Sequence, residues 1–241
     1  MTVIDELMVL LDDEIERTID DCTDALDGRT KQTLSSTLGR LIGRGWVKLV
    51  SERKSAQQKY RITADGQAKV TRTLSHLALS AAEHDGIWLF VVFNIAERQR
   101  KYRDILRNRL NQAGFGRVQN SLWATARDVT FELEDVLTSR NIREHVTILR
   151  PQVSDHDAKE LARSFEWDWK ALARSYDEFI ALGDAYLKSS TQSSLRARLL
   201  VYRYAKLLSQ DPKFPPALEP PEYPRLHAHD WYEKIRPYCY A

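Results

Sequence analysis

The first eighty residues repeat hydrophobic positions at helical spacing and then change to the alternation that is typical of strands. This pattern predicts helices at 3–11, 14–26 and 29–44, strands at 46–50 and 59–63, and a further helix from 64 to about 79. Gly28 supplies a stop for the second helix. Three helices, a two-stranded hairpin and a following helix indicate a winged helix-turn-helix.

The third predicted helix has an apolar face and a polar face. Its apolar stripe consists of Leu34, Leu38, Leu41 and Ile42. At about 100° per residue, the opposite face carries short polar side chains and arginines: Arg29, Gln32, Thr33, Ser36 and Arg40. The major groove of DNA admits one helix, and side chains of these kinds reach base edges there. We therefore expect this face to contact DNA; a winged helix that contacts protein is the alternative.

The predicted hairpin turns through a polar and mostly basic loop at residues 51–58. A basic hairpin tip suits contact with phosphates or with the adjacent minor groove, because cations there displace the counterions of DNA. The residues expected to contact DNA from the hairpin are Arg53, Lys54, Gln58 and Lys59.

The distribution of charge is more informative than its total. The chain carries 36 basic and 34 acidic residues, a formal net charge of +2. Residues 1–28 hold ten acidic residues and one basic residue, whereas residues 29–61 hold nine basic residues and one acidic residue. Such a change is expected when one segment faces a polyanion and the other faces away from it. Two ordinary solvated faces that attract each other are the alternative.

The middle of the chain alternates strands and helices. Residues 87–93 are apolar on both faces and predict a central strand that is covered on each side. Helices are expected at 97–113 and 129–138, and strands at 117–119, 122–124 and 146–149. The resulting order, βαββαβ, is that of a ferredoxin-like domain.

The last third of the chain is predominantly helical. Helices are expected at 157–165, 168–189, 193–209 and 226–238, with a proline-rich irregular segment at 211–224. Trp167, Trp169, Tyr176 and Phe179 supply aromatic residues for a core. The sequence therefore predicts an α+β protein with a winged helix-turn-helix domain at 1–80, a ferredoxin-like domain at 85–150 and a helical C-terminal domain at 155–241.

Several classes of protein do not fit the sequence. No window approaches 18 uninterrupted apolar residues, so no membrane span is expected. The acidic N-terminus lacks the basic region of a secretory signal, and the two cysteines form no disulfide framework, so a cytoplasmic protein is expected. No motif of a hydrolase, nucleotide-binding enzyme or metal centre occurs, so we expect no enzyme, no cofactor and no metal.

Motifs spread over most of the chain resemble the phenylacetic-acid-degradation repressor (PaaX) family of transcriptional regulators. They are Leu38-Gly39-Arg40-Leu41 with Gly45-Trp46, Tyr60-Arg61-Ile62-Thr63 with Gly66, Asp85-Gly86-Ile87-Trp88, Arg103-Asp104-Ile105-Leu106-Arg107, Gly114-Phe115-Gly116, Trp123, Trp169 with Tyr176 and Phe179, Tyr202-Arg203, and Asp211-Pro212-Lys213-Phe214-Pro215. The resemblance implies a homodimeric repressor that binds palindromic operators in double-stranded DNA. It also implies release of the repressor by an aryl-CoA thioester such as phenylacetyl-CoA.

An effector of that kind would need a site for phosphates and a site for its acyl group. Arg100, Arg103 and Arg107 share one face of the predicted helix at 97–113, and they are expected either to bind phosphates or to form a solvated, salt-bridged face. Trp123, Tyr176 and Tyr202 are the candidates for contact with an aromatic acyl group, in a cleft between the middle and C-terminal domains. In the alternative, these aromatic residues are core and the repressor responds to no CoA thioester.

The middle segment also resembles the small CRISPR-associated endonucleases with a ferredoxin fold. Those enzymes hold a divalent metal with an aspartate at the end of the first strand. Here the corresponding strand ends in Phe93-Asn94, and a neutral amide contributes no charge toward a metal ion. We therefore interpret this resemblance as one of fold without the chemistry. A metal-dependent nuclease or RNA-processing protein with a winged-helix targeting domain is the alternative function.

Overall fold

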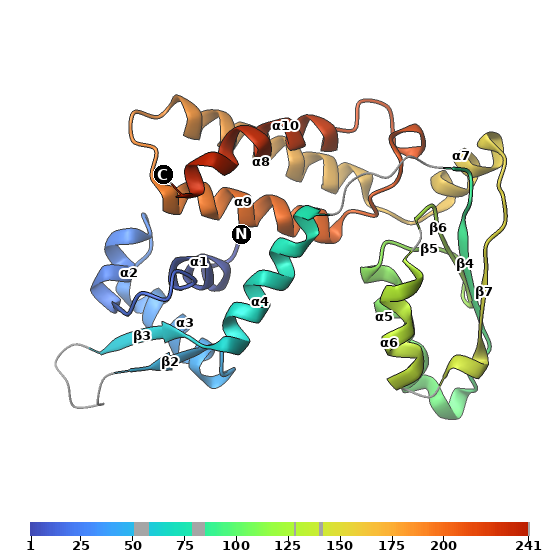
Figure 1. Ribbon diagram of the computed structural model, residues 1–241, viewed down its shortest axis with the longest axis horizontal. Coiled ribbons are helices and arrows are strands. Elements are labelled where there is room, and N and C mark those ends of the chain that lie inside the picture. Colours follow the sequence, from blue (N-terminus) through green and yellow to red (C-terminus); the bar gives the residue numbers. More distant parts are fainter. Residues whose placement is uncertain (51–57, 79–84, 128, 140–141, 241) are drawn as a thin grey trace. The chain divides into compact units, whose positions relative to one another are not determined.

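The computed structural model describes residues 1–50, 58–78, 85–127, 129–139 and 142–240. The chain divides into two compact units. The first combines Met1–Ala78, Tyr176–Lys206 and Leu226–Ala241, and the second combines Leu79–Ser175 and Leu207–Arg225. The chain is an α+β protein with a helical C-terminal region (Figure 1).

The N-terminal part of the first unit contains a three-stranded sheet and its helices. Its elements are α1 (Val3–Leu11), β1 (Arg17–Thr18), α2 (Ile19–Ala25), α3 (Lys31–Gly43), β2 (Val47–Leu49), β3 (Lys59–Ile62), α4 (Ala64–Leu74) and the 3-10 helix η1 (Ser75–Ala78). The strand order is β1-β3-β2, and both pairs are antiparallel. Each of the four α-helices begins after a threonine whose side chain accepts a hydrogen bond from the backbone of the third helical residue. The helix predicted at 3–11 is confirmed.

The helix predicted at 14–26 is wrong over its first five residues. Glu14 has a φ of 61°, and Arg17 and Thr18 form β1 instead. The helix begins only at Ile19, because Thr18 and Asp21 form a capping box that fixes its first turn. The strand pairs Arg17 with Tyr60 and Thr18 with Lys59, so it adds an edge to the predicted hairpin.

The core of this unit lies beneath α3. Leu34, Leu38 and Leu41 are at most 1% exposed, which confirms most of the predicted apolar stripe. Ile42, in contrast, is 40% exposed, and its place on the inner face is taken by Thr37, which is fully buried. The inner face is therefore rotated slightly toward Thr37 from the stripe that the sequence suggested.

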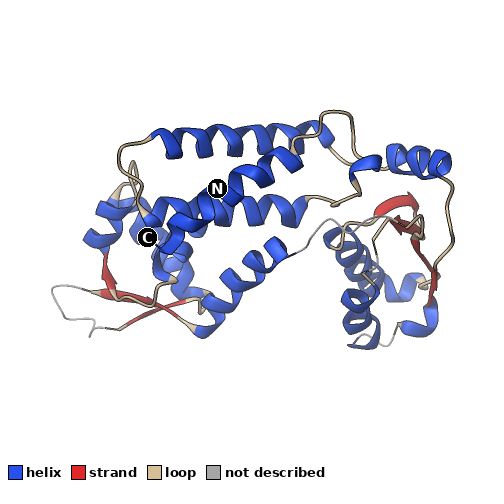
Figure 2. Cartoon of the chain, turned by 45° about the horizontal axis from the view of Figure 1, so that its top comes forward, coloured by secondary structure: helices blue, strands red, loops and turns tan. Residues whose placement is uncertain are grey.

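The C-terminal helices contribute to the same unit. They are α8 (Trp169–Lys188), α9 (Ser194–Gln210), α10 (Arg225–Ile235) and the 3-10 helix η5 (Arg236–Tyr240) (Figure 2). Tyr202 of α9 is 4% exposed, joins the core of the N-terminal helices and donates a hydrogen bond to Thr73 at 3.3 Å. Lys206 of the same helix contacts Asp5 of α1 at 2.7 Å. Residues some two hundred positions apart thus share one core.

The Asp5–Lys206 pair should be a measurable link between α1 and α9. Burial alone would raise the pKa of Asp5, but hydrogen bonds from Lys206 and Thr2 hold this pKa below its ordinary value. The pair therefore stabilises the fold at neutral pH, and the contribution is lost as the pH falls through the lowered pKa. We expect Asp5→Asn to cost about 1–2 kcal/mol of unfolding free energy at pH 7, since it removes one partner of a charge pair that solvent partly screens, and part of a capping box.

Urea denaturation of the full chain at pH 7 and at pH 3 checks this prediction. The deficit of Asp5→Asn should shrink at the lower pH, because the native carboxyl binds its proton as the pH falls toward and through its lowered pKa. Asp184→Asn serves as the matched control, because its partner Lys188 is 75% exposed and such pairs contribute little. A deficit that does not depend on pH would contradict the assigned role of the charge.

The second unit is built on a four-stranded antiparallel sheet. Its elements are β4 (Leu89–Phe93), η2 (Glu97–Gln99), α5 (Arg100–Gln112), β5 (Gly116–Gln119), β6 (Leu122–Thr125), α6 (Thr130–Ser139), η3 (Arg143–His145), β7 (Val146–Leu149), α7 (Asp155–Ser164) and η4 (Pro216–Leu218). The strand order is β5-β6-β4-β7, and β4 pairs antiparallel with both neighbours. Helices α5 and α6 lie side by side on one face of this sheet (Figure 1).

The prediction of a strand covered on both faces is only partly right. Leu89, Val91 and Phe93 of β4 are buried toward α5 and α6. Val92, on the opposite face, is 36% exposed, whereas Phe90 on that face packs against the cluster that contains Trp88. The second face is therefore covered near the start of β4 and open toward its end.

A close backbone contact joins the end of α5 to the proline-rich segment. Gly114 follows the helix with a φ of +84°, and a Cβ atom there would lie 2.9 Å from the carbonyl oxygen of Pro212. Phe214, in the same segment, is fully buried against Trp88 and Phe165.

Within the described residues, no helix has both the length and the apolar character needed to cross a membrane.

Candidate nucleic-acid interface

Hydrogen bonds from threonine side chains fix the N-terminus and the buried face of helix α3. Thr30 caps its N-terminus by accepting a hydrogen bond from the Thr33 amide at 3.3 Å. The buried Thr37 hydroxyl donates to the Thr33 carbonyl at 2.8 Å and accepts a hydrogen bond from Arg40 at 2.9 Å. The Arg40 guanidinium is thereby oriented along the helix rather than left to move freely in solvent.

The outer side of α3 presents the predicted polar stripe. Gln32, Thr33, Ser36 and Arg40 are all exposed. Gln32, Ser36 and Arg40 follow one another at intervals of four residues, so they form one row along the helix. Short hydroxyl and amide side chains followed by an arginine provide both donors and acceptors for base edges.

Part of the positive charge in this region is already neutralised by the acidic N-terminal segment. Arg29 donates two hydrogen bonds to the Glu6 carboxylate, each at 2.8 Å, and this contact raises the pKa of Arg29. Lys31 lies 2.6 Å from Asp20. Arg61 lies 3.5 Å from Glu14. Arg29 therefore has its guanidinium fork committed to α1, and the change of charge along the sequence is in part an internal pairing.

In the part of this region that the structure describes, three cations lack such a partner. Among the described residues, Arg40, Arg44 and Lys48 have no carboxylate within ion-pair distance. Arg44 instead stacks over the Trp46 ring, with 5.1 Å from its guanidinium carbon to the ring centroid. All three are exposed. The sequence did not single out Arg44 and Lys48, although the exposed position of Lys48 follows from strand alternation in β2.

Of the four hairpin residues predicted to contact DNA, the structure describes only two. Arg53 and Lys54 lie outside the described residues. Gln58 is exposed and its side-chain oxygen accepts a hydrogen bond from the Tyr60 hydroxyl at 3.2 Å. Lys59 is exposed at the start of β3. Both side chains are therefore exposed, and their contact with DNA stays a prediction.

A substitution at Gly39 tests whether DNA lies close to the exposed face of α3. A Cβ atom at Gly39 would meet nothing within 4 Å, so the protein itself does not require glycine there. We expect Gly39→Ala to stabilise the free protein by about 0.5–1 kcal/mol, the usual difference between glycine and alanine inside a helix. If DNA lies against this face, the added methyl group should weaken DNA binding at the same time. Thermal unfolding and fluorescence anisotropy with labelled DNA measure the two effects, and stabilisation with undiminished affinity would contradict close approach at Gly39.

The predicted effector residues are divided between the two units. Arg100, Arg103 and Arg107 lie on α5, and Arg103 and Arg107 border one cavity beside the end of β4. Trp123, on β6, is 7% exposed and belongs to the core beneath α5. Tyr176 and Tyr202 belong to the first unit and are 0% and 4% exposed. Of the predicted set, the structure therefore brings only Arg103 and Arg107 to one cavity.

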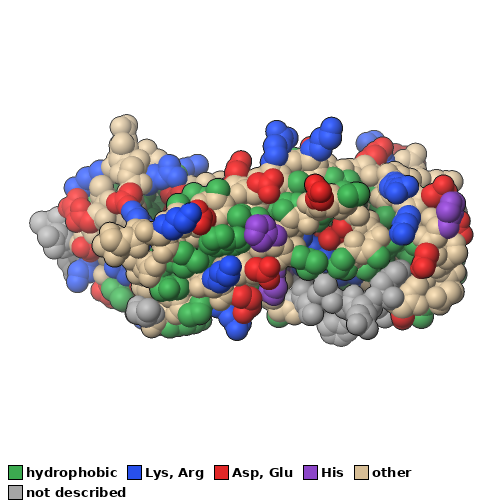
Figure 3. Space-filling model, turned by 90° about the horizontal axis from the view of Figure 1, so that it is seen from above, with side chains coloured by type: hydrophobic (Ala, Val, Ile, Leu, Met, Phe, Trp, Pro, Cys, Tyr) green, Lys and Arg blue, Asp and Glu red, His purple; other side chains and the backbone are tan. Residues whose placement is uncertain are grey.

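Basic and acidic side chains are intermixed on the face that is seen in Figure 3. Exposed candidate metal ligands, His156, Asp157 and Glu160, occur together on α7. They lie within little more than one helical turn, and their exposure makes them an ordinary polar surface.

A protein-family model matches the middle of the chain. Residues 81–162 match the family described as the PaaX protein central Cas2-like domain. Over this segment the predicted resemblance to the PaaX family is confirmed, with a Cas2-like middle domain, and a match to this family suggests a transcriptional regulator.

One solved structure shares the fold over nearly the whole chain. It is an uncharacterized protein, Rv0674, from Mycobacterium tuberculosis, with a TM-score of 0.63 and 18% sequence identity. The similarity covers 97% of this chain and 93% of that chain. No curated protein matches the chain.

Proposed function

We propose that this protein is a transcriptional repressor that binds specific sequences in double-stranded DNA through α3. The observation that carries the proposal is the exposed row of Gln32, Ser36 and Arg40, beside cations that have no carboxylate partner among the described residues. We interpret the first four helices and the sheet β1-β3-β2 as a winged helix-turn-helix in which α3 is the recognition helix. In this arrangement α3 enters the major groove, and Arg44 and Lys48 contact phosphates on its flank.

We further interpret the middle domain as ferredoxin-like. The strand order β5-β6-β4-β7, with α5 and α6 on one face, is the order expected of a βαββαβ unit whose first strand is central. This interpretation agrees with the Cas2-like description of the matched family. The fold by itself assigns no chemistry.

The DNA-binding proposal includes a homodimer, because one short helix reads too few base pairs to select a site in a genome. A two-fold dimer would present two copies of α3 to half-sites separated by whole helical turns of about 10 bp, which gives a palindromic operator. Light scattering of the free protein and of its DNA complex tests this part. A monomer at micromolar concentration that stays monomeric on DNA would contradict it.

The proposal also includes release of the repressor from DNA by an acyl-CoA thioester. Arg100, Arg103 and Arg107 supply cations for phosphates on α5. The candidates for contact with the acyl group, Tyr176 and Tyr202, are buried in the other unit, so they could contact a ligand only after rearrangement. Titrating phenylacetyl-CoA into a preformed protein–DNA complex tests release, with Arg103→Ala as the variant that should resist it.

Incubation with labelled DNA and RNA in the presence of Mg²⁺ or Mn²⁺ separates the repressor from the nuclease alternative. The repressor predicts a stable complex with DNA and intact substrate. Metal-dependent cleavage would favour the nuclease. The neutral Asn94 directly after β4 supports the first outcome, because divalent metals in nucleases are held by carboxylates.

A further inference from the structure

An open cavity of about 340 Å³ lies in the first unit, and its lining comes from α1, α4, α9 and η5. All of its lining residues belong to that unit. Its volume is within the range of natural small-molecule sites. None of the arginines of α5 is part of the lining, so this cavity is separate from the phosphate contacts considered above for an acyl-CoA thioester.

Most of the cavity wall is apolar. Val9 of α1, Val70 and Leu74 of α4, and Val201 of α9 supply aliphatic side chains. Tyr202 of α9 adds an aromatic ring, since its hydroxyl already donates a hydrogen bond to a threonine of α4 at 3.3 Å. A wall of this kind favours the apolar part of a ligand, because burying that part releases it from water.

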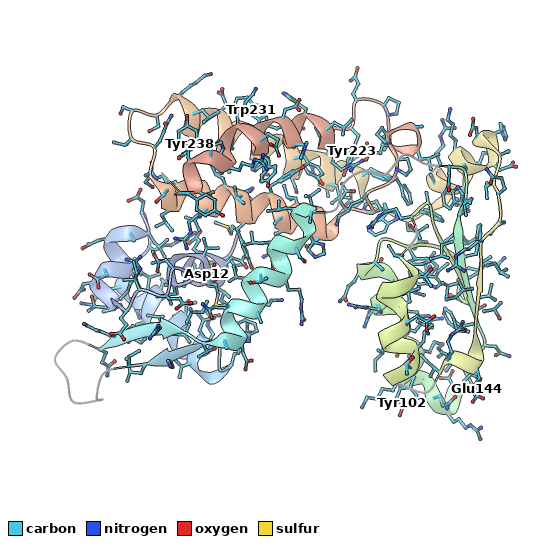
Figure 4. The ribbon with its side chains drawn as sticks, viewed as in Figure 1. Asp12, Tyr102, Glu144, Tyr223, Trp231 and Tyr238 are labelled. Atoms are coloured by element: carbon cyan, nitrogen blue, oxygen red, sulfur yellow. The ribbon has the colours of Figure 1, made fainter. Side chains whose placement is uncertain are left out.

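Asp12 is the polar group of the lining that lacks a partner. It follows α1 directly and is labelled in Figure 4. Among the described residues, its carboxylate has no cation within ion-pair distance and accepts no hydrogen bond. Burial raises the pKa of Asp12, and the nearby Arg198 opposes the increase only in part. A partly buried carboxylate beside an apolar wall therefore gains stability from a cationic partner.

The other charged residues of the lining are already engaged with each other. Asp13 contacts Arg17, and it also contacts Arg198 at 3.6 Å. Arg198 in addition donates a hydrogen bond to the backbone carbonyl of Val9. Two carboxylates and one guanidinium line the cavity, and the guanidinium pairs with Asp13, so the negative charge of Asp12 is left without compensation.

We propose that this cavity binds a small organic amine, whose ammonium group pairs with Asp12 and whose apolar part lies against the aliphatic wall. An ammonium group supplies the charge and the hydrogen-bond donors that the Asp12 carboxylate lacks. The cavity is larger than an ammonium group requires, so the ligand carries an apolar body as well. An anionic ligand is disfavoured, because its charge would lie beside the unpaired carboxylate.

Cys239 provides a local probe of the cavity. It is one of the two cysteines of the chain and is part of the lining, whereas Cys22 is fully buried in the core. An edge-to-face contact of Tyr238 with Tyr186, 5.8 Å between ring centroids, holds η5 and thus Cys239 against α8. A ligand in the cavity should therefore slow the alkylation of Cys239.

The inference goes beyond the proposed function and does not depend on DNA binding, so the full chain is tested without DNA. The probe is hexylamine, with hexan-1-ol and hexanoate as its neutral and anionic comparisons. At pH 8 hexylamine carries its positive charge, as a lysine side chain does. Mass spectrometry follows alkylation of Cys239 by iodoacetamide, and saturation-transfer NMR gives the dissociation constants. We expect binding to weaken in the order hexylamine, hexan-1-ol, hexanoate, with saturable protection of Cys239 by hexylamine at millimolar concentration.

Three variants separate the charge of Asp12 from the shape of the cavity. Asp12→Asn should weaken hexylamine binding about tenfold and leave hexan-1-ol binding unchanged, because it removes only the charge. Asp24→Asn is the matched control, since Asp24 is exposed on α2 outside the lining, and it should leave hexylamine binding unchanged. Val201→Phe should weaken both hexylamine and hexan-1-ol, because the larger side chain occupies the cavity.

Circular dichroism establishes that each variant is folded before the dissociation constants are compared. Absence of any hexylamine signal in NMR at millimolar concentration would overturn the proposal. So would hexanoate that binds as well as hexylamine, or Asp12→Asn that binds hexylamine as tightly as the natural chain. Equal losses in Asp12→Asn and Asp24→Asn would indicate a general attraction of cations to the acidic N-terminal segment and would likewise overturn it.

Discussion

Replacing Arg40 by alanine is expected to weaken binding to the cognate operator by about 1–3 kcal/mol and to change binding to unrelated DNA far less. Arg40 is the cation on the exposed row of α3 that the buried Thr37 holds in a defined orientation. A positioned guanidinium that contacts a base edge contributes discrimination rather than general affinity. Fluorescence anisotropy with cognate and scrambled duplexes at one fixed salt concentration measures the two effects.

Lys48→Gln is the matched control for this prediction. Lys48 is exposed on β2 and has no carboxylate partner in the described part of the chain, so it should contact a phosphate. Its loss should weaken all sequences about equally and lower the slope of log affinity against log salt by about one unit. Lys54→Ala is expected to behave in the same way. If Arg40→Ala and Lys54→Ala both leave cognate affinity unchanged in moderate salt, the assignment of these surfaces is wrong.

Replacing Arg225 by methionine is expected to produce the largest loss of stability, about 3–5 kcal/mol. Arg225 contacts the Glu219 carboxylate at 2.6 Å, and the two side chains are only 6% and 4% exposed. It also donates to the Phe214 carbonyl at 2.8 Å. Methionine fills a similar volume but leaves the Glu219 charge and the carbonyl without this partner. Lys188→Met, at an exposed pair, should cost less than about 1 kcal/mol.

The loss caused by Arg225→Met should depend on pH. Burial raises the pKa of Glu219, and the nearby Arg225 opposes that increase. Without Arg225 the pKa of Glu219 rises further, so the native state binds a proton that the unfolded chain has released. The stability of Arg225→Met should therefore fall as the pH rises above the ordinary pKa of glutamate. Adding Glu219→Gln should restore part of the stability at pH 7, and urea denaturation at pH 4.5 and pH 8 would detect both effects. A deficit that is constant with pH would contradict this account.

Local patterns predicted most individual elements. The helical spacing of Ile4, Leu7, Met8 and Leu11 gave the bounds of α1, and the strand at Val146–Leu149 was also predicted at its observed limits. The two-residue strand β1 was missed, because two residues are too short for any alternation to be recognised. Its existence depends on pairing with β3, which is a tertiary effect.

The partners of charged residues could not be predicted from the sequence. Arg29 and Arg40 look equivalent on the helical wheel, but Arg29 pairs with Glu6, twenty-three positions earlier, and Arg40 pairs with no carboxylate that the structure describes. In the same way, the sequence placed Tyr202 near an effector, whereas α9 carries it into the core beneath the N-terminal helices. Long-range packing therefore decides which of these side chains are already engaged within the protein and which remain exposed for the proposed contact with DNA.

Selection from random double-stranded DNA by the purified full chain tests the central claim most directly. The protein is incubated with the DNA library in Mn²⁺, and bound fragments are sequenced for the natural chain and for Arg40→Ala. The account predicts intact DNA and an enriched inverted repeat whose half-sites are centred about 10 bp, or a multiple of it, apart, with the enrichment lost in Arg40→Ala. Absence of any enriched sequence, enrichment that Arg40→Ala leaves unchanged, or cleavage of the library would contradict it.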